Sequence, residues 1–279
     1  MNINTPAEQL LFSTVRIETI SSSGQCTGTA FIFNYTWNEK TALFLVTNKH
    51  VVAGASSGRF FFTLREGANP MIGQRFDINI ENFENQWYGH KSDDIDLTIM
   101  PLLPLLQLIE KMGKEVFYCS IPHNIIPTQE QIDGLDVLEE VIFIGYPSGM
   151  FDKKNLLPIM RRGTTATPVQ IDYEGNPIFL VDASVFPGSS GSPVFICNCG
   201  SYSDKKGNII LGSSRLFFLG VIAQVVTRIE YGEIKLMPIP TLQIPITETQ
   251  QMIDLGIVYK SSAVIEVVQD FLKTNNEIE

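Results

Sequence analysis

The segment Gly188-Ser189-Ser190-Gly191-Ser192-Pro193 decides how this chain is assigned to a fold. It places Ser190 in a glycine-flanked turn between two apolar stretches. Glycine adopts backbone conformations that a Cβ atom excludes, so the N–H groups of Gly188 and Ser190 can converge beside the Ser190 hydroxyl. Converging N–H donors form an oxyanion hole, and a serine beside them can act as a nucleophile. Ordinary turns share this composition, so other residues must support the interpretation.

A serine hydroxyl becomes an effective nucleophile when a base accepts its proton and an acid orients that base. His50 lies where the apolar, strand-like segment 41–47 runs into a polar turn, whereas the other two histidines lie in polar, loop-like sequence. Asp96 opens the alternating segment 96–102, which is typical of a strand that begins with a carboxylate. The candidate base, acid and nucleophile therefore occur in the order His, Asp, Ser.

These motifs resemble those of the trypsin-like (chymotrypsin-fold) serine peptidases, and are most similar to the bacterial Deg-type and other intracellular branches. Residues 47–51 resemble the box around the family's histidine, residues 96–99 resemble the strand that its aspartate opens, and residues 188–193 resemble the segment around its serine. Three secondary motifs agree with this, at residues 28–32, 145–147 and 219–222. The resemblance covers roughly residues 10–246.

The resemblance implies an all-β fold of two six-stranded antiparallel β-barrels of chymotrypsin type, with a C-terminal α-helix. We expect an N-terminal barrel at residues 10–115, a connection at 116–137, a C-terminal barrel at 138–246 and a helical segment at 247–279. From Ser261 onward the sequence is amphipathic with a possible serine cap, and it fits the helix that the family packs on its second barrel.

Length and patterning agree with two β lobes. A prior of about 150 residues per domain suggests two lobes for 279 residues, and a hydrophobic content of 44% can fill two cores. Apolar segments bounded by Gly, Asn and Asp predict antiparallel strands. The expected strands are residues 15–20, 29–35, 41–47, 60–64, 96–100, 141–145, 178–183, 193–196, 216–224 and 233–237.

In the implied mechanism His50 is the general base, Asp96 orients it, and Ser190 attacks the carbonyl carbon while the N–H groups of Gly188 and Ser190 receive the oxyanion. Asp94 is an alternative acid, because Asp94-Ile95-Asp96-Leu97 fits the minimal pattern twice. Strand alternation that continues from Asp96 through residue 102 favours Asp96 and leaves Asp94 in the preceding turn.

The family's substrate pocket maps onto Ser184, six residues before Ser190, and onto a wall that includes Ala223 and Val225. Trypsin-type preference for Lys or Arg requires an acid at the position of Ser184, and Val225 would narrow the pocket. We therefore predict a preference for small or medium uncharged side chains on the acyl side of the cleaved bond.

The sequence departs from its relatives in two places. Ser189 stands where the zymogen-activated branch has an aspartate that pairs with a newly formed N-terminal ammonium, so activation by that ion pair is not expected. The Deg-type branch carries peptide-binding domains after the protease, whereas only a short segment follows Ile246.

Composition narrows the possible partners. A net charge of −10 argues against nucleic acid or an anionic membrane as partner, since both attract basic surfaces. The N-terminal residues lack the pattern of a signal peptide, and the four cysteines lack the pair that brackets the histidine turn in secreted relatives. We expect a cytoplasmic protein that needs neither cofactor nor metal and acts on a peptide or protein substrate, with any regulatory partner unknown.

The predicted function is that of a serine endopeptidase. A catalytically silent trypsin-like scaffold that binds peptides or proteins is the alternative, and an esterase that uses the same triad is a third interpretation. Retention of all three reactive residue types favours the enzyme, because a scaffold has no chemical need for them together.

Overall fold

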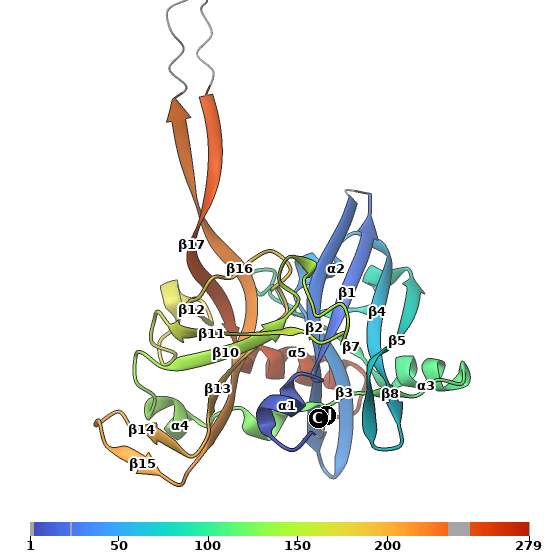
Figure 1. Cartoon of the computed structure of the whole chain (residues 1–279), viewed down its shortest axis with the longest axis horizontal. Helices are drawn as coiled ribbons and strands as arrows, with labels where there is room; N and C mark the ends of the chain where they lie inside the picture. Colours follow the sequence, from blue (N-terminus) through green and yellow to red (C-terminus); the bar gives the residue numbers. More distant parts are fainter. Residues whose placement is uncertain (1–2, 23, 234–245, 279) are drawn as a thin grey trace, which may run out of the picture.

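The fold comes from a computed structural model that describes residues 3–22, 24–233 and 246–278, with only the backbone described at 224–233 and 246–252. Strands dominate, and they form two lobes that lie side by side in Figure 1. The all-β, chymotrypsin-type fold expected from the sequence is confirmed.

The first lobe is a nine-stranded sheet. Its strands follow the order β5-β4-β1-β2-β3-β7-β6, with β8 paired to β4 and β9 paired to β2. This path differs from the closed six-stranded barrel that we expected for this lobe, because the sheet ends in β5 on one side and in the short strand β6 on the other, and β8 and β9 pair outside the path. The strands are β1 (Thr14–Ser21), β2 (Gly24–Trp37), β3 (Lys40–Thr47), β4 (Ala55–Glu66), β5 (Asn69–Glu81), β6 (Tyr88–Gly89), β7 (Thr98–Pro101), β8 (Val116–Phe117) and β9 (Ile121–Pro122).

The second lobe is a closed barrel of six strands in the order β10-β11-β12-β17-β16-β13. These strands are β10 (Glu140–Gly145), β11 (Ile159–Thr165), β12 (Ile178–Asp182), β13 (Pro193–Asn198), β16 (Arg215–Glu233) and β17 (Ile246–Lys260). The two longest, β16 and β17, pair from Gly220 with Lys260 to Glu233 with Ile246, and they continue beyond the barrel as a two-stranded arm (Figure 1).

Helices and one small hairpin complete the structure. The α-helices are α1 (Pro6–Leu10), α2 (Lys49–Val52), α3 (Leu103–Lys111), α4 (Gln129–Asp133) and α5 (Ser261–Thr274). The 3-10 helices are η1 (Phe83–Gln86), η2 (His123–Ile125), η3 (Pro147–Gly149) and η4 (Tyr173–Gly175), and the hairpin pairs β14 (Ser201–Ser203) with β15 (Ile209–Leu211).

Two expectations about the C-terminal part need correction. Residues 246–260 form the strand β17, so the helical segment expected at 247–279 begins only at Ser261, where the amphipathic pattern starts. The N-cap position of α5 is Lys260, and no side chain caps the helix there. Of the strand expected at 233–237, only Glu233 lies within the described residues, as the end of β16.

Alternation along β2 explains how α5 comes to join the lobes. Successive side chains of a strand point to opposite faces. Ala30 and Ile32 enter the core inside the first lobe, whereas Phe31 and Phe33 enter a second core that also contains Phe218 and the apolar face of α5. Helix α5 contacts β6 and β7 of the first lobe as well as β16 and β17 of the second. We had expected this helix to pack on the second barrel. It packs between the two lobes and contacts both.

Polar contacts also tie α5 to the first lobe. The Tyr88 hydroxyl donates to the Asp270 carboxylate at 2.5 Å, and Lys91 forms an ion pair with the same carboxylate. The Lys91 ammonium, and then the Tyr88 hydroxyl, lower the pKa of Asp270. The folded state therefore favours ionised Asp270, and this contact stabilises the fold while the carboxylate is charged.

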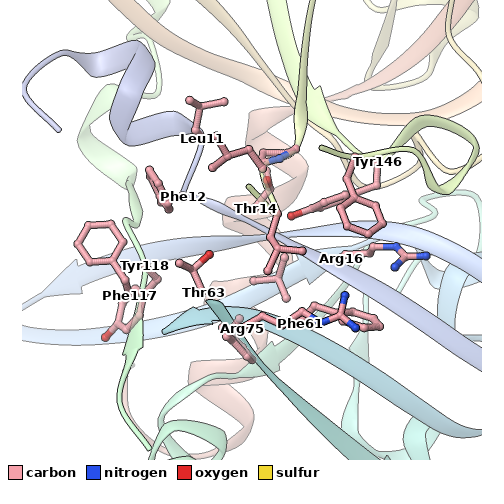
Figure 2. Close-up of a pocket in the computed structure, with 16 residues that line it drawn as sticks. Leu11, Phe12, Thr14, Arg16, Phe61, Thr63, Arg75, Phe117, Tyr118 and Tyr146 are labelled. Carbon is pink, nitrogen blue, oxygen red and sulfur yellow. The ribbon is translucent and has the colours of Figure 1, made fainter. Parts of the chain in front are cut away.

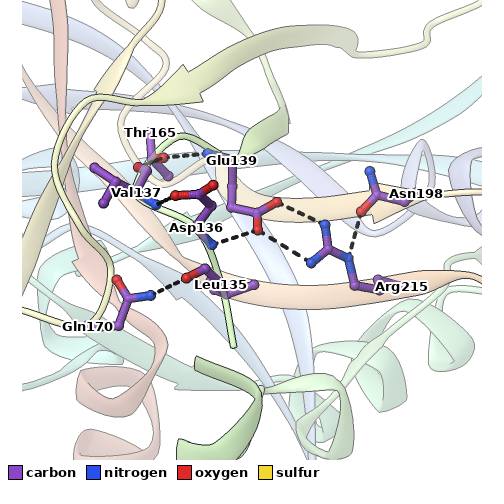
Figure 3. A network of polar contacts seen from close by, with 8 residues as sticks. All are labelled: Leu135, Asp136, Val137, Glu139, Thr165, Gln170, Asn198 and Arg215. Carbon is purple, nitrogen blue, oxygen red and sulfur yellow. Dashed lines mark hydrogen bonds and ion pairs between the residues drawn. The ribbon is translucent and has the colours of Figure 1, made fainter. Parts of the chain in front are cut away.

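A buried ion pair fixes the entry into the second barrel (Figure 3). Arg215 Nη2 donates to Glu139 at 2.8 Å, and only 10% and 9% of these two side chains are exposed. Arg215 Nε donates to Asn198 at 2.9 Å, and the Asp136 N–H donates to Glu139 at 3.0 Å. The Glu139 N–H donates to Thr165 at 2.8 Å. These contacts hold the segment before β10 against β11, β13 and β16.

Candidate active site

His50 is placed by the end of β3 and the short helix α2. The strand ends at Thr47, and Asn48, which is fully buried, turns the chain into α2. The Asn48 side chain donates from Nδ2 to the Asp96 carbonyl oxygen at 2.7 Å. This bond ties the turn that carries His50 to the loop that carries Asp96, two residues before β7 begins at Thr98.

Asp96 contacts His50 through both carboxylate oxygens. Its Oδ2 lies 2.5 Å from His50 Nδ1, and its Oδ1 accepts the His50 backbone N–H at 3.0 Å. The Asp94 side chain is exposed, and its carbonyl oxygen accepts the Tyr259 hydroxyl at 2.8 Å. Of the two carboxylates that the sequence left open, the structure brings Asp96 to the imidazole.

Ser190 lies on the other side of the same imidazole. Its Oγ is 3.0 Å from His50 Nε2 and 2.9 Å from the Ala223 carbonyl oxygen. A hydroxyl carries one hydrogen, so it donates either to His50 or to Ala223. The acid, base and hydroxyl are thus within hydrogen-bonding distance in series, across residues from both lobes.

The turn before Ser190 orients the Gly188 N–H away from the loop that contains Ser148. The Pro187 carbonyl oxygen accepts the Ser148 N–H at 2.5 Å, and a trans peptide points its C=O and N–H in opposite directions. The N–H of Gly188 therefore points away from Ser148. Within the described part of the chain, no acceptor is bonded to the N–H of Gly188 or of Ser190. Both N–H groups therefore remain available as donors in the described part of the chain.

Glycine is needed at both ends of this turn. Gly188 has φ +87°, and a Cβ atom there would lie 2.7 Å from the Tyr146 carbonyl oxygen. Gly191 has φ +84°, and a Cβ atom there would lie 1.8 Å from the Thr29 carbonyl oxygen. The Thr29 N–H donates to the Ser190 carbonyl oxygen at 2.9 Å, so β2 of the first lobe supports the turn directly.

A cavity of about 420 Å³ opens beside these groups. Its lining consists of His50, Asp96, Ser190, Ala223, Val185, Phe186 and Pro187. Ala223 was expected at this position from the sequence. Ser184 is half-buried and does not line this cavity, and the side chain of Val225 lies outside the described residues.

Sequence reasoning missed Val185, Phe186 and Pro187 as lining residues. Their position directly before Gly188 could have identified them, because residues that lead into the turn at Gly188 and Ser190 border the cavity beside that turn. Within that space, the lining other than His50, Asp96 and Ser190 is apolar.

The two remaining histidines and the cysteines lie outside this site. His90 Nε2 is 3.2 Å from Glu266, and His123 Nδ1 accepts the Thr36 N–H at 3.3 Å. The four cysteines are free thiols. Over residues 3–22, 24–233 and 246–278, no cluster of three or more His, Cys, Asp or Glu side chains could hold a metal ion. No helix in the described part is long and apolar enough to cross a membrane.

Residues 28–201 match the family described as the trypsin-like peptidase domain, which is more than half of the chain. The chain belongs to this family. The matched region includes His50, Asp96 and Ser190 together with Gly28 at its start.

Solved structures of serine proteases share the fold. The chain is similar to the HtrA-type protease AlgW bound to a tripeptide, with 16% identity and a TM-score of 0.51, over 96% of this chain and 63% of that one. It is also similar to a serine endoprotease from Yersinia pestis, with 14% identity and a TM-score of 0.49, over 98% and 68% of the two chains. It is similar as well to Rv3671c from M. tuberculosis in its inactive form, with 16% identity and a TM-score of 0.44, over 98% of this chain and 93% of that one. No curated protein matches the chain.

Proposed function

We propose that this protein is a serine endopeptidase that cleaves peptide bonds through an acyl-enzyme intermediate. The observation that supports this best is the hydrogen-bonded series from Asp96 through His50 to Ser190, with 2.5 Å and 3.0 Å between successive heteroatoms. The series faces a cavity of about 420 Å³, which leaves room for a substrate. Nucleophile and base within hydrogen-bonding reach, with an acid orienting the base, form the arrangement required for serine catalysis.

In the first half of the proposed reaction, Ser190 Oγ attacks the carbonyl carbon of the substrate. His50 Nε2 takes the hydroxyl proton, and Asp96 holds Nδ1–H and stabilises the imidazolium that forms. The carbonyl oxygen becomes an oxyanion and accepts the N–H groups of Gly188 and Ser190. His50 then gives its proton to the amine nitrogen, the C–N bond breaks, and the acyl group remains as an ester on Ser190.

In the second half, water replaces the amine. His50 removes a proton from the water as its oxygen attacks the ester carbon, and the same two N–H groups receive the second oxyanion. Collapse of this intermediate breaks the bond to Ser190 Oγ, which recovers its proton from His50. The reaction needs no group beyond those of the chain and water.

The lining of the cavity supports a preference for uncharged residues on the acyl side of the cleaved bond. Val185, Phe186, Pro187 and Ala223 contribute no charge that could pair with Lys, Arg, Asp or Glu. Apolar pockets discriminate by only about 10- to 200-fold per methylene, so we expect a broad rather than a strict profile.

The proposal is tested by digesting a peptide library with the wild-type protein and with matched serine variants. Ser190→Ala should abolish cleavage, because it removes the nucleophile without changing core volume. Ser189→Ala should retain cleavage and serves as control, since its hydroxyl is buried beside the same turn but contacts no catalytic group. Equal cleavage by wild type and Ser190→Ala would refute the proposal, and ester hydrolysis without peptide cleavage would identify an esterase.

A further inference from the structure

The turn that carries the two N–H donors has Ser189, an uncharged residue, directly before the nucleophile, so no ion pair can form from that position. Ser189 is 1% exposed, and its Oγ has no hydrogen-bond partner within the described part of the chain. A buried hydroxyl without a partner does not hold a turn in place. The conformation of Gly188 must therefore depend on other contacts.

Those contacts come from the loop that follows β10. The Ser148 N–H donates to the Pro187 carbonyl oxygen at 2.5 Å, which sets the peptide plane that Pro187 shares with Gly188. The Tyr146 carbonyl oxygen lies so close to Gly188 that no Cβ atom would fit between them. Ser148 itself has φ +50°, a conformation that a residue with a side chain adopts only where its surroundings enforce it. Contacts from residues outside the loop must therefore maintain its conformation.

Arg16, on β1 of the first lobe, packs against this loop. Its guanidinium carbon lies 4.8 Å from the centre of the Phe151 ring and 5.0 Å from the centre of the Phe61 ring. A Cβ atom on Gly149 would lie 3.7 Å from Arg16 Nη2, and Nη2 is also 2.6 Å from Glu18. The Arg16 side chain is only 14% exposed, so these cation–π contacts are shielded from water.

The surroundings of Arg16 are closely packed. Figure 2 shows Arg16, Phe61, Thr14 and Tyr146 around one cavity between the first lobe and the loop. The lining also includes Phe151, the residue of the loop that stacks on Arg16. Tyr146 is buried, and loss of hydration raises its pKa to about 12, so it stays an uncharged phenol. Arg16, from the first lobe, and Tyr146, from the loop, line the same space.

We propose that Arg16 is a positioning residue for the oxyanion hole. It holds Phe151 and Gly149, the loop presents the Ser148 N–H to Pro187, and the Gly188 N–H consequently faces the substrate carbonyl. Arg16 touches no reacting atom, and it belongs to the lobe that carries His50 and Asp96. This inference rests on the proposed function of the Ser190 site for its kinetic consequence, but not for its structural one.

The test compares Arg16→Gln with Arg75→Gln. Arg75 lines the same cavity, stacks on Phe61 at 5.1 Å and pairs with Asp77 at 2.9 Å, but its stacking and ion-pair contacts involve no residue of the loop. Each variant leaves one partly exposed carboxylate without its arginine, with exposures of 34% for Glu18 and 31% for Asp77. A bond from the Gly73 N–H to the Asn155 carbonyl oxygen at 3.2 Å keeps the far end of the loop attached in both.

The first readout is hydrogen exchange at the Ser148 amide, which needs no catalysis. Loss of a shielded cation–π contact should speed exchange by about tenfold in Arg16→Gln and leave Arg75→Gln unchanged. Phe151→Leu, which removes the loop's half of the stack, should match Arg16→Gln. Equal exchange in the Arg16 and Arg75 variants would overturn the assignment, whether or not the protein cleaves peptides.

The second readout is the division between kcat and KM. A misplaced Gly188 donor should lower kcat by about 10- to 100-fold, less than the 10²- to 10³-fold typical when a donor is lost, with KM nearly unchanged. Arg75→Gln should keep wild-type kcat. A fall in kcat that is the same in both variants would also overturn the assignment. A wild-type protein that cleaves nothing would refute the proposed function instead, and the exchange rates would still decide the role of Arg16.

Discussion

Replacing Gly188 by alanine should remove most activity while leaving the protein folded. Gly188 has φ +87°, and the new Cβ atom would lie 2.7 Å from the Tyr146 carbonyl oxygen and 3.1 Å from the Ser148 nitrogen. Both neighbours are backbone atoms, so the clash cannot be relieved by rotating a side chain. The turn must shift, and with it the N–H group that we assign to the oxyanion hole.

The expected size of each effect follows from this geometry. A left-handed conformation costs a residue with a side chain about 1–2 kcal/mol. Unfolding entropy of about 2.1 cal/mol/K per residue converts that cost into a fall in Tm of about 2–3 °C for a chain of 279 residues. Loss of one oxyanion donor should lower kcat by about 10²- to 10³-fold with little change in KM.

Gly207→Ala is the matched control. Gly207 has φ +81°, but a Cβ atom there would meet nothing within 4 Å. This variant carries the same conformational cost, so it should lose a similar 2–3 °C in Tm by about the same entropy, with unchanged kcat. The assay is steady-state peptide cleavage with thermal unfolding of both variants. A Gly188→Ala protein with wild-type kcat would refute the assignment of its N–H group to the oxyanion hole.

Three further changes test other parts of the structure. Asp96→Asn should lower kcat by about 10⁴-fold while Asp94→Asn stays active, and the reverse result in steady-state kinetics would transfer the orienting role to Asp94. Arg215→Met should lower the free energy of unfolding in denaturant by about 3–5 kcal/mol, because it leaves the Glu139 carboxylate buried without its partner. A loss below about 1 kcal/mol, the value of an exposed ion pair, would contradict a stabilising role for the buried pair. Asp270→Asn should lower stability near neutral pH, and the difference from wild type should disappear as the pH falls through the lowered pKa of Asp270, because protonation removes the same charge in the wild type. A difference between these two proteins that is constant with pH would exclude this charge as the cause.

Local motifs predicted most of the candidate site. His50, Asp96, Ser190 and the two N–H donors were predicted because each lies in a short segment whose glycines, strand pattern or flanking residues are visible in the sequence. The strand pattern favoured Asp96 and left Asp94 open, because the choice depends on which carboxylate faces His50 once residues 46 positions apart come together. Folding, rather than local pattern, decides that contact.

Elements stabilised by distant partners were harder to predict. Strand β17 was expected to be helical, and its extended form depends on pairing with β12 and β16. Residues 30–33 of β2 are continuously apolar, but nothing local indicates that α5 and the second lobe cover the face with Phe31 and Phe33. The stack of Arg16 on Phe151 joins residues 135 positions apart, so a single sequence carries no signal for it.

The proposed reaction depends on a covalent acyl intermediate at Ser190, with His50 as base. The most direct measurement is mass-spectrometric mapping of a fluorophosphonate adduct on the purified protein. We expect one adduct, on Ser190, that is lost in Ser190→Ala and forms much more slowly in His50→Gln. Peptide cleavage by a protein that forms no adduct on Ser190, or equal labelling of wild type and His50→Gln, would show that Ser190 and His50 do not act in this way.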